Sequence, residues 1–159
     1  MPNPVKPIPE GFHTITPSLI CKDAARAIEF YKRVFGAEEL MRMPTPDGKI
    51  GHAHLKIGDS NLFVNDEFPQ MGVHAPTSPG SVYLFTYVKD VDAVFNGAVA
   101  AGAKVDMPVT DQFWGDRYGK ITDPFGHQWG IATHTEDVSP EEMDRRAKEF
   151  AKKMAAGQS

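Results

Sequence analysis

Two histidines separated by one residue have the spacing of a candidate metal site. His52 and His54 alternate with apolar residues over residues 51–57, a pattern typical of a strand with one buried face. Both imidazoles would then lie on the face opposite the core, where their nitrogens could bind a divalent metal. Such a displaced site needs a third ligand, from Asp66, Glu67 or His134. The alternative is that both histidines line a cavity or face solvent.

Three aromatic residues on one predicted strand could bind a flat organic molecule. Tyr83, Phe85 and Tyr87 are spaced two residues apart in the segment 81–88, so their rings share one face. If this face lines a cavity, the rings would stack on a partly apolar ligand and the tyrosine hydroxyls would orient it. The alternative is that the three rings fill a layer of the core.

The segment 113–118 combines a tryptophan, an aspartate and an arginine beside a glycine. Trp114, Asp116 and Arg117 could form a rim over an anionic or aromatic ligand, because arginine pairs with carboxylates through two hydrogen bonds and also stacks on rings. In the alternative, Asp116 and Arg117 pair with each other or with a neighbour to fix a hairpin, and Trp114 covers the sheet edge.

The elements that position these residues occur twice, 67 residues apart. Apolar residues recur with a helical period after Asp23, and again at the same offsets after Asp90. Each aspartate can cap the free N–H groups at the start of its helix. We therefore predict helices at 24–35 and 91–101, each inside a module of order β-α-β-β-β, and two such modules would enclose a ligand cleft.

Turn residues and alternating patterns divide the rest of the chain. In the tail, Ser139-Pro140-Glu141-Glu142 is a capping box that starts a helix with one apolar stripe, which would pack on its own domain or on a partner subunit. The predicted strands are 13–20, 37–43, 49–57, 61–65, 81–88, 104–110, 117–123 and 127–134. The predicted domains are a proline-rich arm (1–12), the first module (13–66), a linker (67–80), the second module (81–135) and a helical tail (136–159).

Composition narrows the class of protein. Of 159 residues, 41% are hydrophobic and 24% are charged, and the net charge of −4 argues against a nucleic-acid-binding surface. Cys21 is the only cysteine, which excludes an intramolecular disulfide and favours a reducing cytoplasm. The first residues lack the apolar run of a signal peptide, and no run is long enough to span a bilayer. We therefore expect a cytoplasmic protein with neither a membrane nor a nucleic-acid partner.

Three segments carry a family resemblance: the helix and its flanks from Asp23 to Ala37, the run Asp-Pro-Phe-Gly-His-Gln-Trp ending at Trp129, and Phe113–Gly126 followed by 132–142. Together they resemble the vicinal oxygen chelate superfamily, which includes glyoxalase I, extradiol dioxygenases and the bleomycin and fosfomycin resistance proteins, and more narrowly its PhnB-like branch. The resemblance implies an α+β fold. Paired βαβββ modules would form a cupped eight-stranded mixed sheet with helices outside, a ligand cavity on the concave face, and a homodimer.

The superfamily's enzymes hold a divalent metal with side chains from the first and fourth strands of both modules. The resemblance places these positions at Thr16, Val64 or Asn65, Tyr83 and Gly130. None offers the imidazole or carboxylate that such a metal needs. We therefore expect no cofactor and no metal at the standard positions, with a displaced divalent-metal site at His52, His54 and Asp66 as the alternative.

These observations leave three functions open. The leading hypothesis is a homodimer that binds a small organic molecule, aromatic or anionic, in a cavity of the paired modules, as the antibiotic-resistance members do. The alternative is a glyoxalase-type lyase, isomerase or dioxygenase that uses the displaced metal or acts through general acid–base groups. A third is a structural or partner-binding role for the C-terminal helix. The expected ligand contacts are Thr16, His54, Tyr83, Phe85, Tyr87, Trp114, Asp116 and Arg117.

Overall fold

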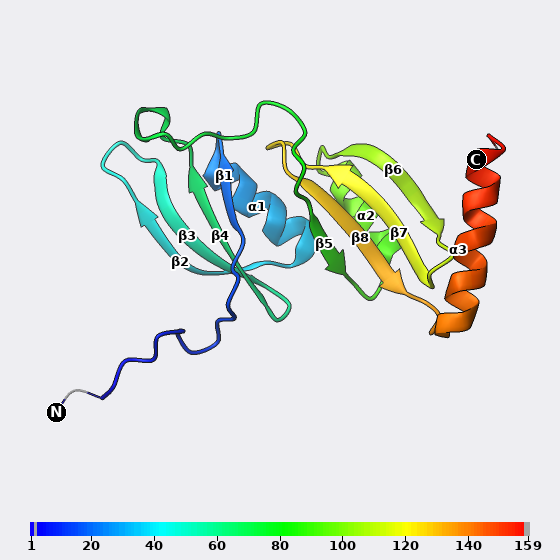
Figure 1. The fold of residues 1–159 in the computed structure, drawn as a ribbon. Coiled ribbons are helices and arrows are strands. Elements are labelled where there is room, and N and C mark those ends of the chain that lie inside the picture. Colours follow the sequence, from blue (N-terminus) through cyan, green and yellow to red (C-terminus); the bar gives the residue numbers. More distant parts are fainter. Residues whose placement is uncertain (2, 158–159) are drawn as a thin grey trace. The chain divides into compact units, whose positions relative to one another are not determined.

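The chain divides into two compact units, Met1–Ser78 and Pro79–Ser159. The computed structural model describes residues 1 and 3–157. Each unit contains one β-α-β-β-β module, and a third helix, α3 (Pro140–Ala155), follows the second module (Figure 1). The predicted fold class, paired βαβββ modules with a C-terminal helix, is confirmed, and the eight strands form two four-stranded sheets.

In the first unit, a mixed sheet packs against the helix α1 (Ala24–Phe35). The strand order is β1-β4-β3-β2, in which β1 is parallel to β4 and the other pairs are antiparallel. Asp23 caps α1 through its side chain, as predicted. The strands and a short 3-10 helix that follows them are β1 (Ser18–Cys21), β2 (Glu38–Pro44), β3 (Ile50–Ile57), β4 (Ser60–Asp66) and η1 (Pro69–Met71).

The second unit repeats this arrangement around the helix α2 (Val91–Ala100). The strand order is β5-β8-β7-β6, and β5 is parallel to β8. Asp90 caps α2 through its side chain, again as predicted. The strands are β5 (Leu84–Tyr87), β6 (Lys104–Asp111), β7 (Asp116–Thr122) and β8 (Gln128–His134).

A hydrogen bond from the helix to the end of the fourth strand is present in both units. In the first, Oδ1 of the buried Asp66 accepts from Ala24 N at 2.8 Å. In the second, Thr133 Oγ1 accepts from Val91 N at 2.9 Å. Asp66 also accepts from Ile50 N at 2.7 Å, so this carboxylate joins α1, β3 and β4. The repeat therefore extends to the contact that docks each helix on its sheet.

Each helix lies on one face of its sheet, and that face forms the core. Side chains alternate along a strand, so every second residue points toward the helix and the others point to the opposite face. The core side chains on the strands include Ala53, Leu55, Leu62 and Val64 in the first unit, and Ile121, Trp129 and Ile131 in the second.

Two predicted strands are too long at their N-terminal ends. The first strand begins at Ser18 rather than at residue 13, because Pro17 has no N–H to continue the ladder with β4. Strand β5 begins at Leu84 rather than at residue 81. Its partner β8 starts only at Gln128, so residues 81 and 82 run past the end of the neighbouring strand. The other boundaries differ by at most one residue.

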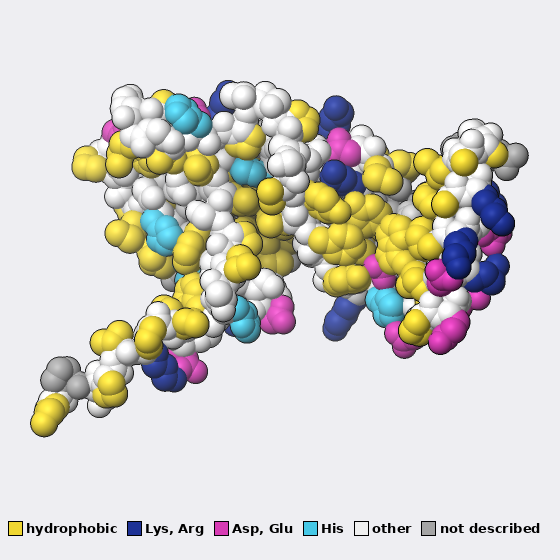
Figure 2. Space-filling view, viewed as in Figure 1, with side chains coloured by type: hydrophobic (Ala, Val, Ile, Leu, Met, Phe, Trp, Pro, Cys, Tyr) yellow, Lys and Arg dark blue, Asp and Glu magenta, His cyan; other side chains and the backbone are white. Residues whose placement is uncertain are grey.

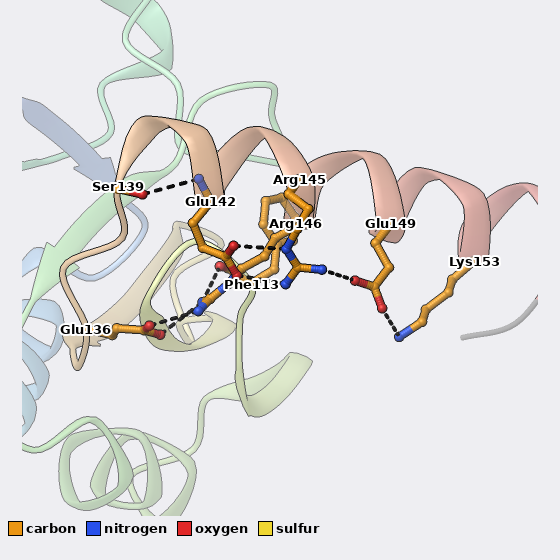
Figure 3. A network of polar contacts seen from close by, with 8 residues as sticks. All are labelled: Phe113, Glu136, Ser139, Glu142, Arg145, Arg146, Glu149 and Lys153. Carbon is orange, nitrogen blue, oxygen red and sulfur yellow. Dashed lines mark hydrogen bonds and ion pairs between the residues drawn. The ribbon is translucent and has the colours of Figure 1, made fainter.

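The C-terminal helix α3 is tied to the second unit through its first turns (Figure 3). Ser139 Oγ accepts from Glu142 N at 3.2 Å, which confirms the predicted cap. Arg146 forms two hydrogen bonds with Glu136, at 2.8 and 2.9 Å, and donates to Phe113 O at 3.2 Å. Among the described residues, no helix is long and apolar enough to cross a membrane.

The apolar stripe of α3 is only partly covered within its own unit. Phe150 packs against Phe113 with ring centroids 5.1 Å apart, yet Phe150 remains 46% exposed and Met154 58% exposed. No residue of α3 is buried among those described. The third and fourth turns of the helix therefore leave apolar side chains exposed within this unit.

Removal of the Asp66 carboxylate will destabilise the first unit. In Asp66→Ala, the backbone N–H groups of Ala24 and Ile50 lose their acceptor in a buried setting, which costs about 1–3 kcal/mol for each group. We expect the free energy of unfolding, measured in urea by circular dichroism, to fall by about 2–5 kcal/mol. Asp59→Ala, in an exposed turn, is the matched control and should change it by less than about 0.5 kcal/mol. Equal losses in the two variants would contradict this assignment.

Candidate functional site

Hydrophobic side chains gather on the face of the second sheet that is opposite α2 (Figure 2), and several of them are aromatic. Tyr83, Phe85 and Tyr87 are 44%, 42% and 62% exposed, so they do not fill a layer of the core within this unit. Tyr118, from β7, stacks on Phe85 with ring centroids 5.4 Å apart and an interplanar angle of 4°. We call these four residues the aromatic face.

A glycine beneath the rings allows them to pack closely. A Cβ atom on Gly130 would lie 2.9 Å from the Tyr118 ring and 3.2 Å from the rings of Phe85 and Tyr83. A real Cβ essentially never comes within 3.0 Å of another heavy atom, so a side chain here would push the rings outward. The lack of a side chain at Gly130 therefore allows the rings to pack close to the backbone of β8.

Charged and polar groups border the aromatic face. The Lys120 ammonium lies 4.5 Å from the centroid of the Tyr83 ring, within the range of a cation–π contact. Burial, together with the nearby Tyr83 hydroxyl, raises the pKa of Tyr118 to about 12. Tyr118 is therefore a neutral hydrogen-bond donor at physiological pH.

The buried Asp116 connects this face to the end of β8. Its Oδ2 accepts from Tyr87 Oη and from Trp114 Nε1, both at 2.9 Å, and its Oδ1 lies 2.8 Å from His134 Nδ1. His134 Nε2 lies 2.7 Å from the exposed Asp137. A single carboxylate thus orients three side chains from β5, β8 and the turn before β7.

The charges in this cluster shift its pKa values. Burial alone would raise the pKa of Asp116, but hydrogen bonds from His134, Tyr87 and Trp114 outweigh it and lower the pKa. Hydrogen bonds to Asp137 and to Asp116 raise the pKa of His134. The hydrogen bond to Asp116 raises the pKa of Tyr87. The cluster therefore favours an ionised Asp116 beside a protonated His134.

A shallow hollow of about 490 Å³ lies beside this cluster. It is lined by residues from the end of β5, the loop after it, and the end of β8. Lys89 and His134 contribute cationic groups, and Tyr87 contributes a ring shared with the aromatic face. The lining residues are Tyr87, Val88, Lys89, Thr133 and His134.

Arg117 does not join the other candidate residues. Its guanidinium donates to both carboxylate oxygens of Asp92 on α2, at 2.8 and 2.9 Å, and to Asp111 at 3.3 Å. Arg117 follows Asp116 on β7, so the two side chains point to opposite faces. The arrangement matches the structural alternative for Arg117, in which it pairs with neighbours.

The histidine pair and Asp66 also lie on opposite faces of their sheet. His54 packs against Phe12 and Phe63, with ring centroids 5.0 and 5.5 Å apart. The Asp66 side chain is instead bound to the N-terminus of α1 on the core face. Among residues 1 and 3–157, no group of three His, Cys, Asp or Glu side chains is placed to hold a metal. The predicted set His52, His54 and Asp66 is therefore not assembled.

The structure also corrects which residue of this chain is equivalent to one of the family's metal ligands. Ser18 pairs with Phe63 as Phe85 pairs with Gly130, so Phe63, and neither Val64 nor Asn65, is equivalent to Gly130. The four equivalent positions are therefore Thr16, Phe63, Tyr83 and Gly130. Thr16 carries a hydroxyl and Tyr83 a phenol, whereas Phe63 has only a phenyl ring and Gly130 has no side chain. This donor set does not fit a divalent metal.

Sequence reasoning missed several residues of this site. Tyr118 and Lys120 share strand parity with Asp116, and that alternation was the signal that could have found them. No local sequence pattern indicated the role of Gly130, because the rings that pack against it come from other segments of the chain and meet over β8 only in the folded sheet.

Comparisons with known proteins agree with this architecture. A family model described as Glyoxalase/Bleomycin resistance protein/Dioxygenase superfamily matches residues 11–131. The chain therefore belongs to this superfamily. Mycobacterium tuberculosis Rv0887c, an uncharacterized protein, is 45% identical over 134 residues, which are 81% of this chain and 79% of the relative.

Two solved structures illustrate the likeness. TioX from Micromonospora sp. ML1 has a TM-score of 0.60 and 31% identity, and the match covers 77% of this chain and 99% of TioX. The PhnB protein from Bacillus cereus has a TM-score of 0.64 and 20% identity over 76% of this chain and 99% of that chain, so it shows the shared fold.

The stability contributed by His134 will depend on pH. Its pKa in the folded protein is raised above the ordinary 6.5, so its stabilising effect is complete below that value and disappears as the pH rises through the raised pKa. Asp116 acts in the opposite sense: its pKa lies below 3.8, so its contribution is lost as the pH falls through the lowered value. We therefore expect His134→Gln to lower the free energy of unfolding more at pH 6 than at pH 9. A difference of equal size at both pH values would contradict this account.

Proposed function

We propose that this protein binds a small, flat organic molecule, aromatic and carrying an anionic group, on the aromatic face of its second unit, in the cytoplasm. The observation that carries the proposal is that the half-exposed rings of Tyr83 and Phe85 converge with the buried ring of Tyr118 over Gly130. Exposed aromatic side chains that adjoin one another are unusual on a surface without a binding role. The family includes bleomycin resistance proteins, which supports a binding role.

The chemistry of the face suits such a ligand. A ring stacked on Phe85 or Tyr83 would gain about 0.5–1.5 kcal/mol beyond the area that it buries. Lys120 borders the face at Tyr83, and Lys89 and His134 line the adjoining hollow. The two lysine ammonium groups can pair with a carboxylate, sulfonate or phosphate on the ligand, whereas both ring nitrogens of His134 are already bonded to Asp116 and Asp137.

A metal-dependent lyase, isomerase or dioxygenase reaction receives less support from the side chains present. The positions equivalent to the family's metal ligands carry Thr16, Phe63, Tyr83 and Gly130, and Asp66 points away from His52 and His54. We therefore derive no reaction step through a divalent metal.

We also propose that the protein acts as a homodimer. Large apolar side chains remain exposed within both units, and exposed apolar patches often mark protein–protein contacts. On gel filtration with light scattering, we expect twice the 17.5 kDa mass of one chain. The mass of a single chain over the micromolar range would contradict this proposal. The exposed side chains include Leu40, Val105, Met107, Phe150 and Met154.

Ligand binding should depend on the aromatic face. The first probe is 8-anilino-1-naphthalenesulfonate, an aromatic anion whose binding is measured by its fluorescence. A panel of aromatic carboxylates is then tested in thermal-shift assays, because a ligand that binds the folded state raises its stability. Phe85→Ala removes one stacking ring, which costs about 1 kcal/mol and raises the Kd about fivefold.

Arg117→Ala provides the matched control, because Arg117 is on the same sheet but pairs with α2 on the opposite face. We expect the Kd of the folded Arg117→Ala variant to remain within about twofold of the wild type. If Phe85→Ala has no effect, or if Arg117→Ala weakens binding equally, the ligand does not occupy the aromatic face.

A further inference from the structure

The first unit carries a second exposed face with a chemistry of its own. On the side of the sheet opposite α1, Met41 lies directly across from His54, and Met43 across from His52. Residues opposite each other on antiparallel strands point to the same side, with Cβ atoms about 4.5–5.5 Å apart. The four side chains therefore form a compact square on β2 and β3, which we call the Met–His face.

The donor atoms of this face can be reached from solvent within the unit. Met41 and Met43 are 39% and 55% exposed, and both histidines are half-buried. These thioethers are therefore not required to fill the core, which uses the residues of opposite parity on the same strands. Two sulfur and two imidazole donors are thus available side by side.

The environment of His54 leaves one ring nitrogen free to bind a ligand. Asn61 donates its Nδ2–H to Gly11 O at 2.8 Å, so its Oδ1 is the atom that faces His54 Nε2, also at 2.8 Å. Nε2 must then carry a hydrogen, and neutral His54 keeps its lone pair on Nδ1. Metal-binding histidines usually have their second nitrogen held by a partner of this kind.

The other histidine is held by packing instead. The His52 ring contacts Phe63 edge-on, with centroids 4.7 Å apart, and among residues 1 and 3–157 no hydrogen bond to this ring is found. Phe12 also covers His54, so aromatic rings flank both imidazoles. An apolar surround of this kind limits the access of water to a bound ion.

We propose that the Met–His face binds one soft monovalent cation, Cu(I) in the cell, through thioether sulfur from Met41 and Met43 and imidazole nitrogen from His52 and His54. Thioether ligands select Cu(I), whereas Mg²⁺, Ca²⁺ and Mn²⁺ prefer oxygen ligands. The site shares His52 and His54 with the predicted divalent site, but two thioethers take the place of Asp66 and favour a different class of metal. It is also independent of the ligand proposed for the second unit.

Competition for Cu(I) tests the proposal directly. The full chain is titrated without oxygen into the coloured Cu(I)–bicinchoninate complex, and the loss of colour measures the metal withdrawn. We expect one equivalent per chain for the wild type, and a loss of affinity of at least about tenfold when both Met41 and Met43 are changed to Leu. Asn61→Leu should weaken binding by about 10–100-fold, because it releases the His54 ring from its partner.

Two control variants identify other sources of binding. The chain has seven methionines, and Met71→Leu with Met107→Leu alters two exposed ones outside the Met–His face. Cys21→Ala removes the single thiol. Both controls should keep the wild-type affinity. The proposal is overturned if no Cu(I) is withdrawn, if binding survives in the Met41/Met43 variant, or if Cys21→Ala abolishes it.

Binding of silver(I) to the wild-type chain provides a second test, which needs no variant and so is not affected by misfolding of a variant. Silver(I) is a diamagnetic soft cation, and the methionine methyl signals can be followed by NMR in the wild-type chain. We expect Ag(I) to shift the Met41 and Met43 methyl signals in parallel to saturation at one equivalent, while those of Met71 and Met107 stay in place. Uniform shifts of all exposed methionines would show non-specific binding and would overturn the proposal.

Discussion

One constraint organises both units: a single helix covers one face of each four-stranded sheet. Because strand side chains alternate, this determines for every strand residue whether it joins the core or the opposite face. The docking contact is the hydrogen bond from the first turn of the helix to the end of the fourth strand, made by Asp66 in one unit and Thr133 in the other. The register of each strand therefore determines whether a candidate site residue points toward the helix or to the opposite face of the sheet. A shift of one residue in register would exchange these two faces.

In the second unit, this constraint separates residues that are adjacent in the chain. Asp116 turns toward Tyr87, Trp114 and His134, whereas Arg117 turns toward α2 and pairs with Asp92. The aromatic face then depends on a position without a side chain. Gly130 occupies a place where the family's enzymes carry a metal ligand, and here it leaves room for rings from two other strands. The lack of a side chain at this position allows the rings of Tyr118, Phe85 and Tyr83 to pack close to the backbone of β8.

The two units share a scaffold but differ on their exposed faces. The 67-residue repeat preserves the helix caps, the parallel strand pair and the docking hydrogen bond. On the face opposite the helix, the first unit presents methionines and histidines, and the second presents tyrosines and a phenylalanine. Core positions are constrained by packing on the helix, whereas exposed positions are free to differ. Each unit can therefore carry its own binding chemistry.

The sequence by itself determined the elements whose signals are local. Helix α1 is present at the predicted residues, and Asp23, Asp90 and Ser139 cap their helices, because capping and helical period involve residues within a few positions of each other. The partners of Asp66 and the pairing of Met41 with His54 depend instead on the register between strands and on helix docking. Tertiary structure decided these contacts, because they join residues distant in the chain that no local pattern relates.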